Sequence, residues 1–229
     1  VTVEIDRGLH EAAAERLEGL QNVTLLRADV LEDKHHLSAE VDAEVREALE
    51  PVDGPLKVVG NLPYWISSPL LVALLEWDVP LGGIYVMLQA EVADRLTAPP
   101  GGDSYGPLTV VVDHWGEAEK LFDVPPSAFW PQPEVQSSFV HIRPEPVSPR
   151  PESYGLFYEV VTTLFQNRRK MVRKGLKIGW DRDVSSRVTR ESGVDGRKRP
   201  EKLSTEQFVA LSNALAGVLA EQDTEREGT

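Results

Sequence analysis

The sequence Asn61-Leu62-Pro63-Tyr64 decides the fold, because it lies between two apolar runs of different length. The run before it, Leu56–Gly60, predicts a short buried strand. The run after it, Leu70–Trp77, predicts a helix that has Ser68 as its N-cap and Pro69 in its first position. We therefore expect the tetrapeptide in a loop at the carboxyl end of a strand, where open α/β sheets bind their ligands.

The residue types of this loop suit the binding of a planar amino group. Asn61 offers a side-chain carbonyl as an acceptor. Pro63 has no N–H and stiffens the turn, so the loop presents backbone carbonyls, including that of Leu62, to a ligand. Tyr64 offers a flat face for a nucleobase taken out of its stack. The alternative is a plain strand-to-helix turn, with the asparagine in a left-handed conformation and Tyr64 in the core.

Length and composition restrict the class of protein. The 229 residues suit one medium domain with a small appendage. No run of the sequence is long and apolar enough to span a membrane. The absence of cysteine excludes disulfides and thiolate metal sites and fits a cytoplasmic protein. The pair His35-His36 lacks partners at ligand spacing, so we expect no metal.

The charge of the chain is uneven. The formal net charge is −13, from 24 basic and 37 acidic residues, which by itself argues against a nucleic-acid partner. Two segments reverse this sign. The first holds Arg168, Arg169, Lys170, Arg173, Lys174 and Lys177, and the second holds Arg197, Lys198, Arg199 and Lys202. The first segment has no interleaved acid, so we expect it to bind RNA phosphates; the alternative is a solvated helix face.

The start of the chain predicts a βαβ unit. Strand patterns at Val1–Asp6 and Val23–Asp29 flank a helical pattern at Gly8–Leu20. Glu4, at the tip of the first strand, suits a ribose diol, because one carboxylate accepts two hydrogen bonds. Asp29, at the tip of the second strand, suits an adenine amino group. The alternative for both acids is a helix cap or a solvated turn.

The middle of the chain predicts further strands and helices. We expect helices at Val41–Leu49 and Gln89–Leu96, strands at Gly82–Leu88, Leu121–Val124 and Ser138–Ile142, and a helix or strand at Leu108–Trp115. The proline-rich segment Pro125–Pro133 predicts a stiff, extended loop. This loop would hold Phe129 opposite Tyr64, around a flipped base. Phe129 as a buried anchor of its own loop is an equal alternative.

Beyond the proline-rich linker Pro144–Pro151 the pattern is helical only. Helices are predicted at Leu156–Phe165, Met171–Ile178, Val184–Ser192 and Phe208–Leu219, with Ser204 as the cap of the last one. We therefore expect a first domain over residues 1–146, a helical domain that docks on RNA over 152–222, and a disordered tail over 223–229.

With these residues in view, the chain resembles ribosomal RNA adenine dimethyltransferases of the small-subunit, KsgA type. The resemblance covers nearly the whole chain. It lies in Val3–Asp6, Asp29, Gly60–Tyr64, Ile66–Ser67, Pro69–Leu70, Met87–Gln89, Glu91–Val92, Tyr105–Leu108, Val124–Phe129, Pro131, Pro133 and Phe165–Lys170. So many ordered segments make a chance match a poor explanation.

The resemblance implies an α/β fold: a Rossmann-like class I methyltransferase sheet, mostly parallel, with a small all-α C-terminal domain. It implies a helix at Leu108–Trp115. It also implies S-adenosylmethionine as cofactor and a hairpin of small-subunit rRNA as partner. Two methyl groups would pass to N6 of each of two adjacent adenines during ribosome assembly. We expect a monomer without membrane attachment.

The resemblance also implies roles for single residues. Glu4, with Ile5, would bind the cofactor ribose, and Asp29, with Val30, its adenine. Asn61 and Leu62 would receive the target amine, and Tyr64 would stack on the base. On the loop argument above, Pro63 and Phe129 complete the catalytic candidates, and Asn61 would also contact the cofactor.

One departure from the family concerns its glycine-rich loop, which precedes the segment that matches Val1 and is not in this sequence. Glycine lets that loop approach the methionine end of the cofactor. The strand before it is expected between Val1–Asp6 and Leu56–Gly60, and without it two strand edges stay unpaired. We therefore expect a fragment of a longer chain.

Three other functions compete with this interpretation. A large-subunit rRNA adenine methyltransferase of the resistance type shares the loop, but the segments Val124–Phe129 and Asn167–Lys170 favour the small-subunit type. A DNA adenine methyltransferase shares only the use of such a loop to hold an adenine amino group. A catalytically silent rRNA-binding or assembly module follows from the absent glycine-rich loop. Cofactor binding separates this last class from the enzymes.

Overall fold

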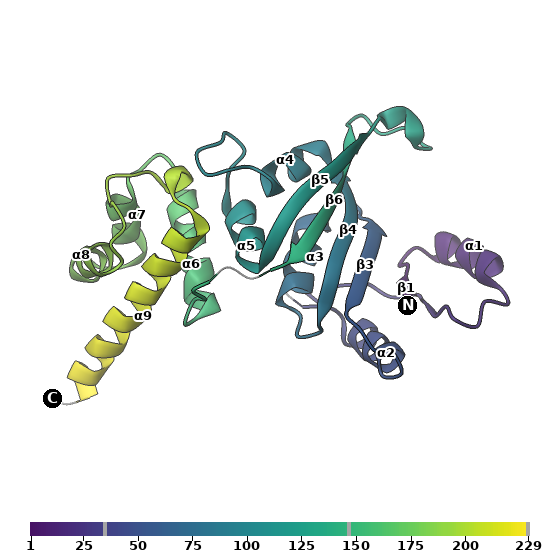
Figure 1. The fold of residues 1–229 in the computed structure, drawn as a ribbon, viewed down its shortest axis with the longest axis horizontal. Helices are drawn as coiled ribbons and strands as arrows, with labels where there is room; N and C mark the ends of the chain where they lie inside the picture. The colour runs from purple at the N-terminus through teal and green to yellow at the C-terminus, as the bar shows by residue number, and fades with distance from the viewer. Residues whose placement is uncertain (34–35, 146–147, 228–229) are drawn as a thin grey trace. The chain divides into compact units, whose positions relative to one another are not determined.

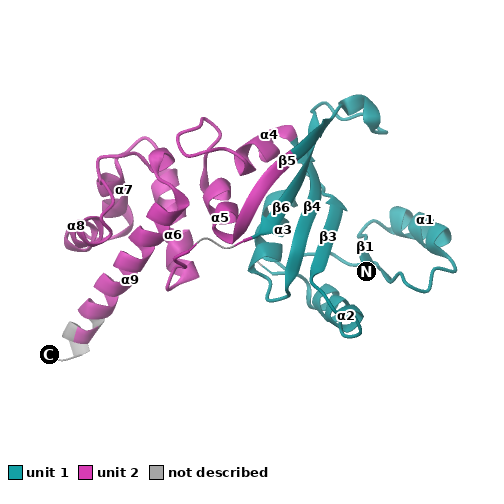
Figure 2. Cartoon of the chain, in the orientation of Figure 1, with its two compact units in different colours: residues 1–89, 121–144 teal, residues 90–120, 145–229 magenta. Residues whose placement is uncertain are grey.

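The computed structural model describes residues 1–33, 36–145 and 148–227. The chain forms two compact units, coloured separately in Figure 2. Unit 1 comprises residues 1–89 and 121–144, and unit 2 comprises residues 90–120 and the chain from 145 onward. The functional boundaries expected at 146 and 152 remain a prediction, and residue 146 lies outside the described residues.

Unit 1 contains a small sheet and most of a larger sheet (Figure 1). The smaller sheet pairs β1 (Thr2–Val3) with β2 (Leu25–Leu26) in parallel. The larger sheet has the order β3 (Leu56–Asn61), β4 (Leu81–Gln89), β6 (Ser137–Pro144), β5 (Gly116–Val124). Strands β3 and β4 run parallel, and β6 runs antiparallel to β4. The described larger sheet is therefore mixed.

The core of unit 1 follows from two apolar segments. In β4, Ile84, Val86 and Leu88 alternate with less buried neighbours and are fully buried, as expected for one face of a strand. The helix α3 (Ser67–Glu76) is buried on nearly every side, with Leu71 fully enclosed. Each such side chain contributes about 1.5–3 kcal/mol to folding. This burial fixes the loop between β3 and α3.

The first βαβ unit is confirmed, but its elements are shorter than predicted. Helix α1 (Arg7–Leu17) begins one residue early, because the Asp6 carboxylate accepts a hydrogen bond from Leu9 N at 2.9 Å and caps it. No residue of α1 is buried, and Leu9 is 61% exposed, so the apolar face expected there is not covered.

The two sheets of unit 1 are separate among the described residues. β3 forms an edge of the larger sheet, and Val59 on this strand is 73% exposed. The place expected for a further strand, between β1 and β3, holds none in the described part of the chain. Helix α2 (Ala39–Leu49) is confirmed, and Trp77 Nε1 ties the end of α3 to it by donating to Asp42 Oδ1 at 2.6 Å.

Unit 2 is mainly helical. It contains α4 (Ala90–Leu96), α5 (Pro107–Trp115), α6 (Tyr154–Gln166), α7 (Val172–Gly179), α8 (Arg182–Glu191) and α9 (Thr205–Glu227), with short 3-10 turns elsewhere in the chain. Phe157, Leu164 and Phe208 are fully buried in one cluster that α6, α7, α8 and α9 share. The helix at Leu108–Trp115 is confirmed, whereas β5 begins five residues before its predicted start at Leu121.

The ends of the helices in unit 2 show why the chain folds locally as it does. Asp181 caps α8 by accepting from Asp183 N and Val184 N at 2.8 and 2.9 Å. Before α9, Ser204 N donates to Gln207 Oε1 at 3.2 Å, and Gln207 N donates to the Ser204 backbone carbonyl at 3.1 Å, so the expected cap by the Ser204 side chain stays a prediction. Helix α9 continues to Glu227, into the segment where a tail was expected, and residues 228–229 lie outside the described residues. None of the described helices is long and apolar enough to cross a membrane.

Candidate functional site

The loop after β3 is anchored in the core and open at its tip. Leu62 is 8% exposed, and its N–H donates to Met87 O at 3.3 Å. The Pro63 carbonyl accepts from Ile66 N at 3.2 Å, and the Tyr64 carbonyl accepts from Ser67 Oγ at 3.0 Å. These bonds close a turn and start α3 at Ser67. The predicted start, with Ser68 as cap and Pro69 first, was therefore wrong.

The exposed groups of the loop are those expected to meet a ligand. The Asn61 side chain is exposed at the end of β3. Tyr64 is 41% exposed, and the described part of the chain has no non-glycine residue with positive φ. The alternative of a left-handed asparagine with a core tyrosine is therefore wrong. The loop leaves an amide oxygen and an aromatic face available to solvent.

The two strand-tip carboxylates have similar local geometry. Glu4 is half-buried, its N–H donates to Leu26 O at 3.0 Å, and its Oε1 accepts from Asp6 N at 2.8 Å. Asp29 is exposed, and its Oδ1 accepts from Leu31 N at 3.0 Å. Neither acid caps a helix. Each has one oxygen bound to a backbone N–H two residues later, which leaves the second oxygen as an acceptor.

Beside these carboxylates lie the apolar residues predicted to accompany them. Ile5 is 57% exposed, and Val30 is half-buried. The Val30 carbonyl accepts from Ser38 N at 3.0 Å, which holds the segment after β2. An exposed isoleucine next to a half-buried carboxylate is compatible with packing against a ligand that carries both apolar and hydroxyl groups.

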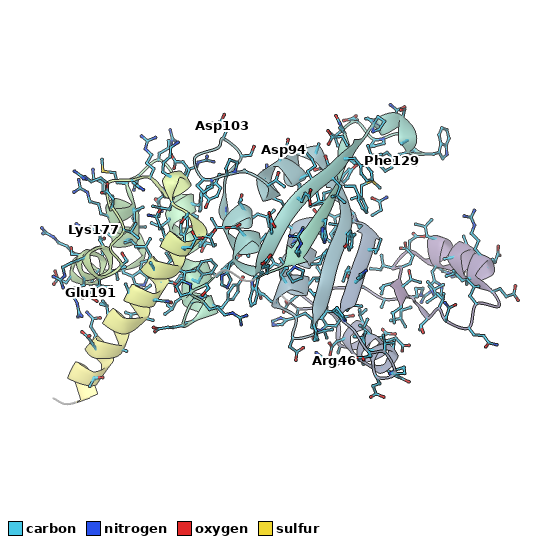
Figure 3. The ribbon with its side chains drawn as sticks, in the orientation of Figure 1. Arg46, Asp94, Asp103, Phe129, Lys177 and Glu191 are labelled. Carbon is cyan, nitrogen blue, oxygen red and sulfur yellow. The ribbon has the colours of Figure 1, made fainter. Side chains whose placement is uncertain are left out.

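Phe129 lies in the β5–β6 loop, where Figure 3 labels it. A 3-10 turn, Pro126–Ala128, precedes it, and Phe129 N donates to Pro126 O at 3.2 Å. Its side chain is half-buried. No ring contact joins Phe129 to Tyr64 among the described residues, so the expected sandwich around a base stays a prediction.

The first basic segment spans the α6–α7 loop and one face of α7. Val172, Gly175 and Leu176 are buried on the opposite face of this helix. The exposed cations are Arg169, Lys170, Arg173, Lys174 and Lys177, and none has an ion pair with another described residue. Arg168 is half-buried, and its Nη2 donates to Asp103 O at 3.1 Å. Figure 3 labels Lys177 on α7.

The structure joins the second basic segment to the first, which the sequence did not predict. Val172 N donates to Lys198 O at 2.9 Å, and Arg173 N donates to Gly196 O at 3.0 Å. A Cβ on Gly196 would lie 2.6 Å from Thr189 Cγ2, so this approach requires glycine. Lys198, Arg199 and Lys202 are exposed, whereas Arg197 pairs with Asp195 at 3.2 Å. We name the two segments together the basic surface of unit 2.

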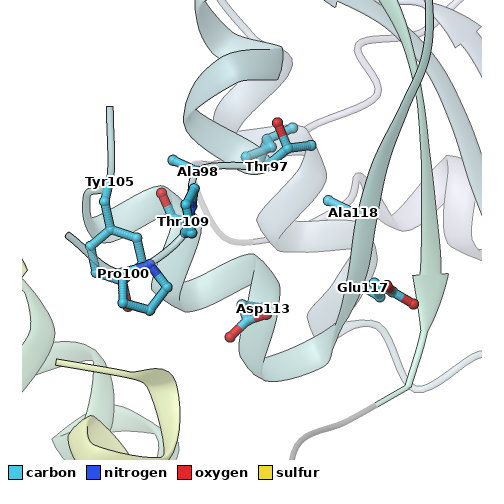
Figure 4. Close-up of a pocket in the computed structure, with 10 residues that line it drawn as sticks. Thr97, Ala98, Pro100, Tyr105, Thr109, Asp113, Glu117 and Ala118 are labelled. Carbon is cyan, nitrogen blue, oxygen red and sulfur yellow. The ribbon is translucent and has the colours of Figure 1, made fainter. Parts of the chain in front are cut away.

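A separate pocket in unit 2, drawn in Figure 4, has a structural role. It is lined by Leu96–Pro100, Tyr105, Thr109, Asp113, Glu117 and Ala118. Thr205 Oγ1 donates to Asp113 Oδ2, and Tyr105 Oη donates to Leu203 O at 2.8 Å. The lining residues Asp113 and Tyr105 therefore hold the start of α9. Burial raises the pKa of Asp113 above its ordinary value. None of the predicted site residues lies here.

No group of three or more potential metal ligands occurs in residues 1–33, 36–145 and 148–227. His36 is exposed and pairs with Asp33 at 2.9 Å, and this hydrogen bond raises the pKa of His36. His35, the other member of the predicted pair, lies outside the described residues. The described site residues are thus acceptors and aromatic rings in unit 1, with cations in unit 2.

The fold and the loop together define the class of the chain. A parallel β3–β4 pair, an Asn-Leu-Pro-Tyr loop after β3 and carboxylates after β1 and β2 belong to an α/β methyltransferase. The family model described as "Ribosomal RNA adenine dimethylase" matches residues 1–217. The chain belongs to this family.

Relatives and solved structures agree with this assignment. The chain is 36% identical to "Ribosomal RNA small subunit methyltransferase A" of Halothermothrix orenii, over 97% of this chain and 73% of that protein. It is 38% identical to the protein of the same name from Bacillus mycoides, over 94% of this chain and 73% of the relative.

Two solved structures share the fold. The 23S rRNA methyltransferase ErmE has a TM-score of 0.61 at 23% identity, over 93% of this chain and 80% of that chain. A dimethyladenosine transferase from Plasmodium falciparum has a TM-score of 0.68 at 21% identity, over 92% of this chain and 79% of that chain. The predicted α/β methyltransferase fold is confirmed.

Proposed function

We propose that this chain transfers methyl groups from S-adenosylmethionine to N6 of adenines in small-subunit rRNA. The observation that carries the proposal is the Asn61–Tyr64 loop, which exposes an amide acceptor and an aromatic face at the end of β3. Family membership and the names of the relatives support the substrate. The product would be two adjacent dimethylated adenines in one hairpin, made during ribosome assembly.

The strand-tip carboxylates fit the cofactor. Glu4 retains one oxygen for a ribose diol, and Asp29 retains one for an adenine amino group. Ile5 and Val30 supply apolar surface beside them. When bound, S-adenosylmethionine supplies a methyl group made electrophilic by the neighbouring sulfonium. Replacing Asp29 with alanine should weaken cofactor binding in calorimetry, because the adenine amine loses its acceptor.

The loop would act by holding the target amine. The N6 lone pair of adenine is delocalised into the ring, so the amine is a weak nucleophile. Acceptors at Asn61 and at the Leu62 and Pro63 carbonyls would draw the two N–H bonds aside and keep the lone pair in line. Such positioning contributes roughly 7–11 kcal/mol in well-oriented reactions. No general base is needed, because the proton leaves after the nitrogen has become cationic.

Tyr64 and Phe129 would hold the base itself. Tyr64 presents its ring beside Asn61, and Phe129 is held by the turn after Pro126. The basic surface of unit 2 would bind the phosphates of the same RNA, with Lys198, Arg199 and Lys202 added to the predicted segment. Lys198 and Arg199 have no ion-pair partner among the described residues, so phosphate would replace only water and counterions there. Lys202 Nζ donates to Gly101 O at 3.2 Å, a bond that phosphate would have to share or replace.

A decisive experiment compares Asn61→Ala with Lys57→Ala, an exposed residue of the same strand. Asn61→Ala should lower methyl transfer to a small-subunit rRNA hairpin by about 100-fold or more, by analogy with other deleted preorganised hydrogen-bonding groups. Lys57→Ala should leave the rate unchanged. RNA affinity should stay the same in both. Equal transfer by both variants would refute the assignment of Asn61.

Two of the three competing functions are tested with the same chain. A large-subunit enzyme would methylate a large-subunit hairpin in preference to the small-subunit one. A silent assembly module would bind RNA but give no heat with S-adenosylmethionine in calorimetry. The small-subunit relatives at 36–38% identity favour the first proposal, since the large-subunit structure shares only the fold.

A further inference from the structure

Two tryptophans of unit 1 are exposed in the two loops that carry the candidate base-binding rings. Trp65 follows Tyr64 and is 73% exposed. Trp130 follows Phe129 and is 97% exposed. In each loop the inner ring, Tyr64 or Phe129, is more buried than the outer tryptophan. Neither tryptophan has a ring contact with another described residue, so no aromatic ring covers either indole.

Both loops hold their tryptophans at fixed positions. Leu62 and Ile66, on either side of Trp65, are 8% and 7% exposed and anchor that loop in the core. Trp130 lies between the Pro126–Ala128 turn and Pro131. The base of this second loop is closed by Ser138 Oγ, which donates to Asp123 Oδ1 at 2.6 Å. Anchored loops lose little entropy when a ligand covers their tips.

Packing between neighbouring strands does not explain the exposure of these two tryptophans. Phe122 is also exposed, but its ring stacks on Phe139 with 5.2 Å between centroids, as a pair between neighbouring strands. Trp65 and Trp130 have no such partner among the described residues. A large open aromatic face on a stiff loop is the usual platform for an unpaired nucleobase, because every base has a π-face.

We propose that Trp65 and Trp130 stack on the unpaired nucleobases that flank the target adenine in the RNA substrate. This inference rests on the proposed function. Tyr64 and Phe129 would hold the flipped base, and the neighbouring tryptophan in each loop would hold a base next to it in the strand. Stacking tolerates any base, so the two tryptophans would add affinity for single-stranded RNA and little sequence preference.

The test measures binding of a fluorescently labelled small-subunit hairpin by anisotropy, without cofactor. Trp65→Leu and Trp130→Leu keep an apolar side chain and remove the ring. Each should weaken binding by about 5- to 150-fold, the range for loss of one base stack. Trp65→Phe and Trp130→Phe keep a ring and should recover most of the affinity. Leu20→Ala, at an exposed apolar residue outside these loops, is the control.

A second RNA series identifies the bases. One nucleotide on either side of the target adenine is made abasic, one position at a time. At the position where a tryptophan stacks, the abasic RNA should bind wild-type protein as weakly as the leucine variant, and the variant should lose nothing further. If each leucine substitution weakens binding as much with abasic RNA as with intact RNA, at every position tested, the proposal is overturned.

Other outcomes separate this proposal from the proposed function. Failure of the wild-type chain to bind or methylate the hairpin would refute the proposed function. Normal binding by wild type and by both leucine variants would refute the stacking alone. A tryptophan fluorescence shift with phosphatidylglycerol vesicles, but none with RNA, would show that the rings bind lipid and would likewise overturn it.

Discussion

The salt dependence of RNA binding gives a quantitative test of the basic surface. Five exposed cations of the first segment, Arg169, Lys170, Arg173, Lys174 and Lys177, have no ion pair with a described residue. If each contacts one phosphate, these five cations alone contribute about −3.5 to −4.5 to the slope of log K against log salt. Raising the salt from about 50 to about 200 mM should then weaken binding roughly 100- to 500-fold through these contacts.

The perturbation that tests this number is the triple variant Arg173→Ala, Lys174→Ala, Lys177→Ala. All three side chains project from α7 opposite its buried face, so their removal leaves Val172 and Leu176 in the core. The slope should become shallower by about 2 to 3, because each lost phosphate contact removes about 0.7–0.9. Affinity should converge with that of wild type at high salt.

The assay is a filter-binding or anisotropy titration of a small-subunit hairpin at four or more salt concentrations. Arg190→Ala is the matched control, since Arg190 is also exposed in unit 2 but pairs with Glu191 at 3.3 Å. It should leave the slope unchanged. An unchanged slope in the triple variant would refute phosphate binding by α7 and favour a merely solvated helix face.

Two further predictions concern the stability of unit 2. Burial, with Arg150 nearby, lowers the pKa of His114 below its ordinary value of 6.5, so the unfolded chain binds more protons below that pH. The free energy of unfolding should therefore fall as pH decreases through 6.5 and level off below the folded-state pKa. Urea unfolding midpoints measured across this pH range should show the decrease for wild type and a smaller decrease for His114→Phe. Gly196→Ala should cost about 1–3 kcal/mol in urea unfolding, because its Cβ would meet Thr189 and Arg173, whereas Gly193→Asn, at a positive φ of 68°, should cost less.

Local patterns predicted the elements whose neighbours follow directly in the sequence. The runs around β4 and α3 are apolar enough to be buried whatever the rest of the chain does, and both were located to within a few residues. β1 and β2 were predicted too long, because a strand extends only as far as its partner pairs with it. Here that pairing ends after two residues on each strand.

Features that depend on contacts between residues far apart in the chain were not predicted from the sequence. The hydrogen bond from Val172 N to Lys198 O joins residues 26 positions apart, and the close approach of Gly196 to Thr189 and Arg173 accompanies it. The exposure of Trp130 also runs against the general preference of tryptophan for burial. A sequence signal existed for the first feature, since Gly196 precedes three cations directly.

The overall negative charge and the basic surface act in the same direction. A net charge of −13 makes contact with RNA unfavourable over most of the chain. The exposed cations around α7 and Lys198 are then the region where phosphate is attracted. On the proposed function, RNA bound there would be held in few orientations, because turning it toward the acidic remainder costs energy. The acidic excess would thus restrict how RNA binds, and the local cations would supply the affinity.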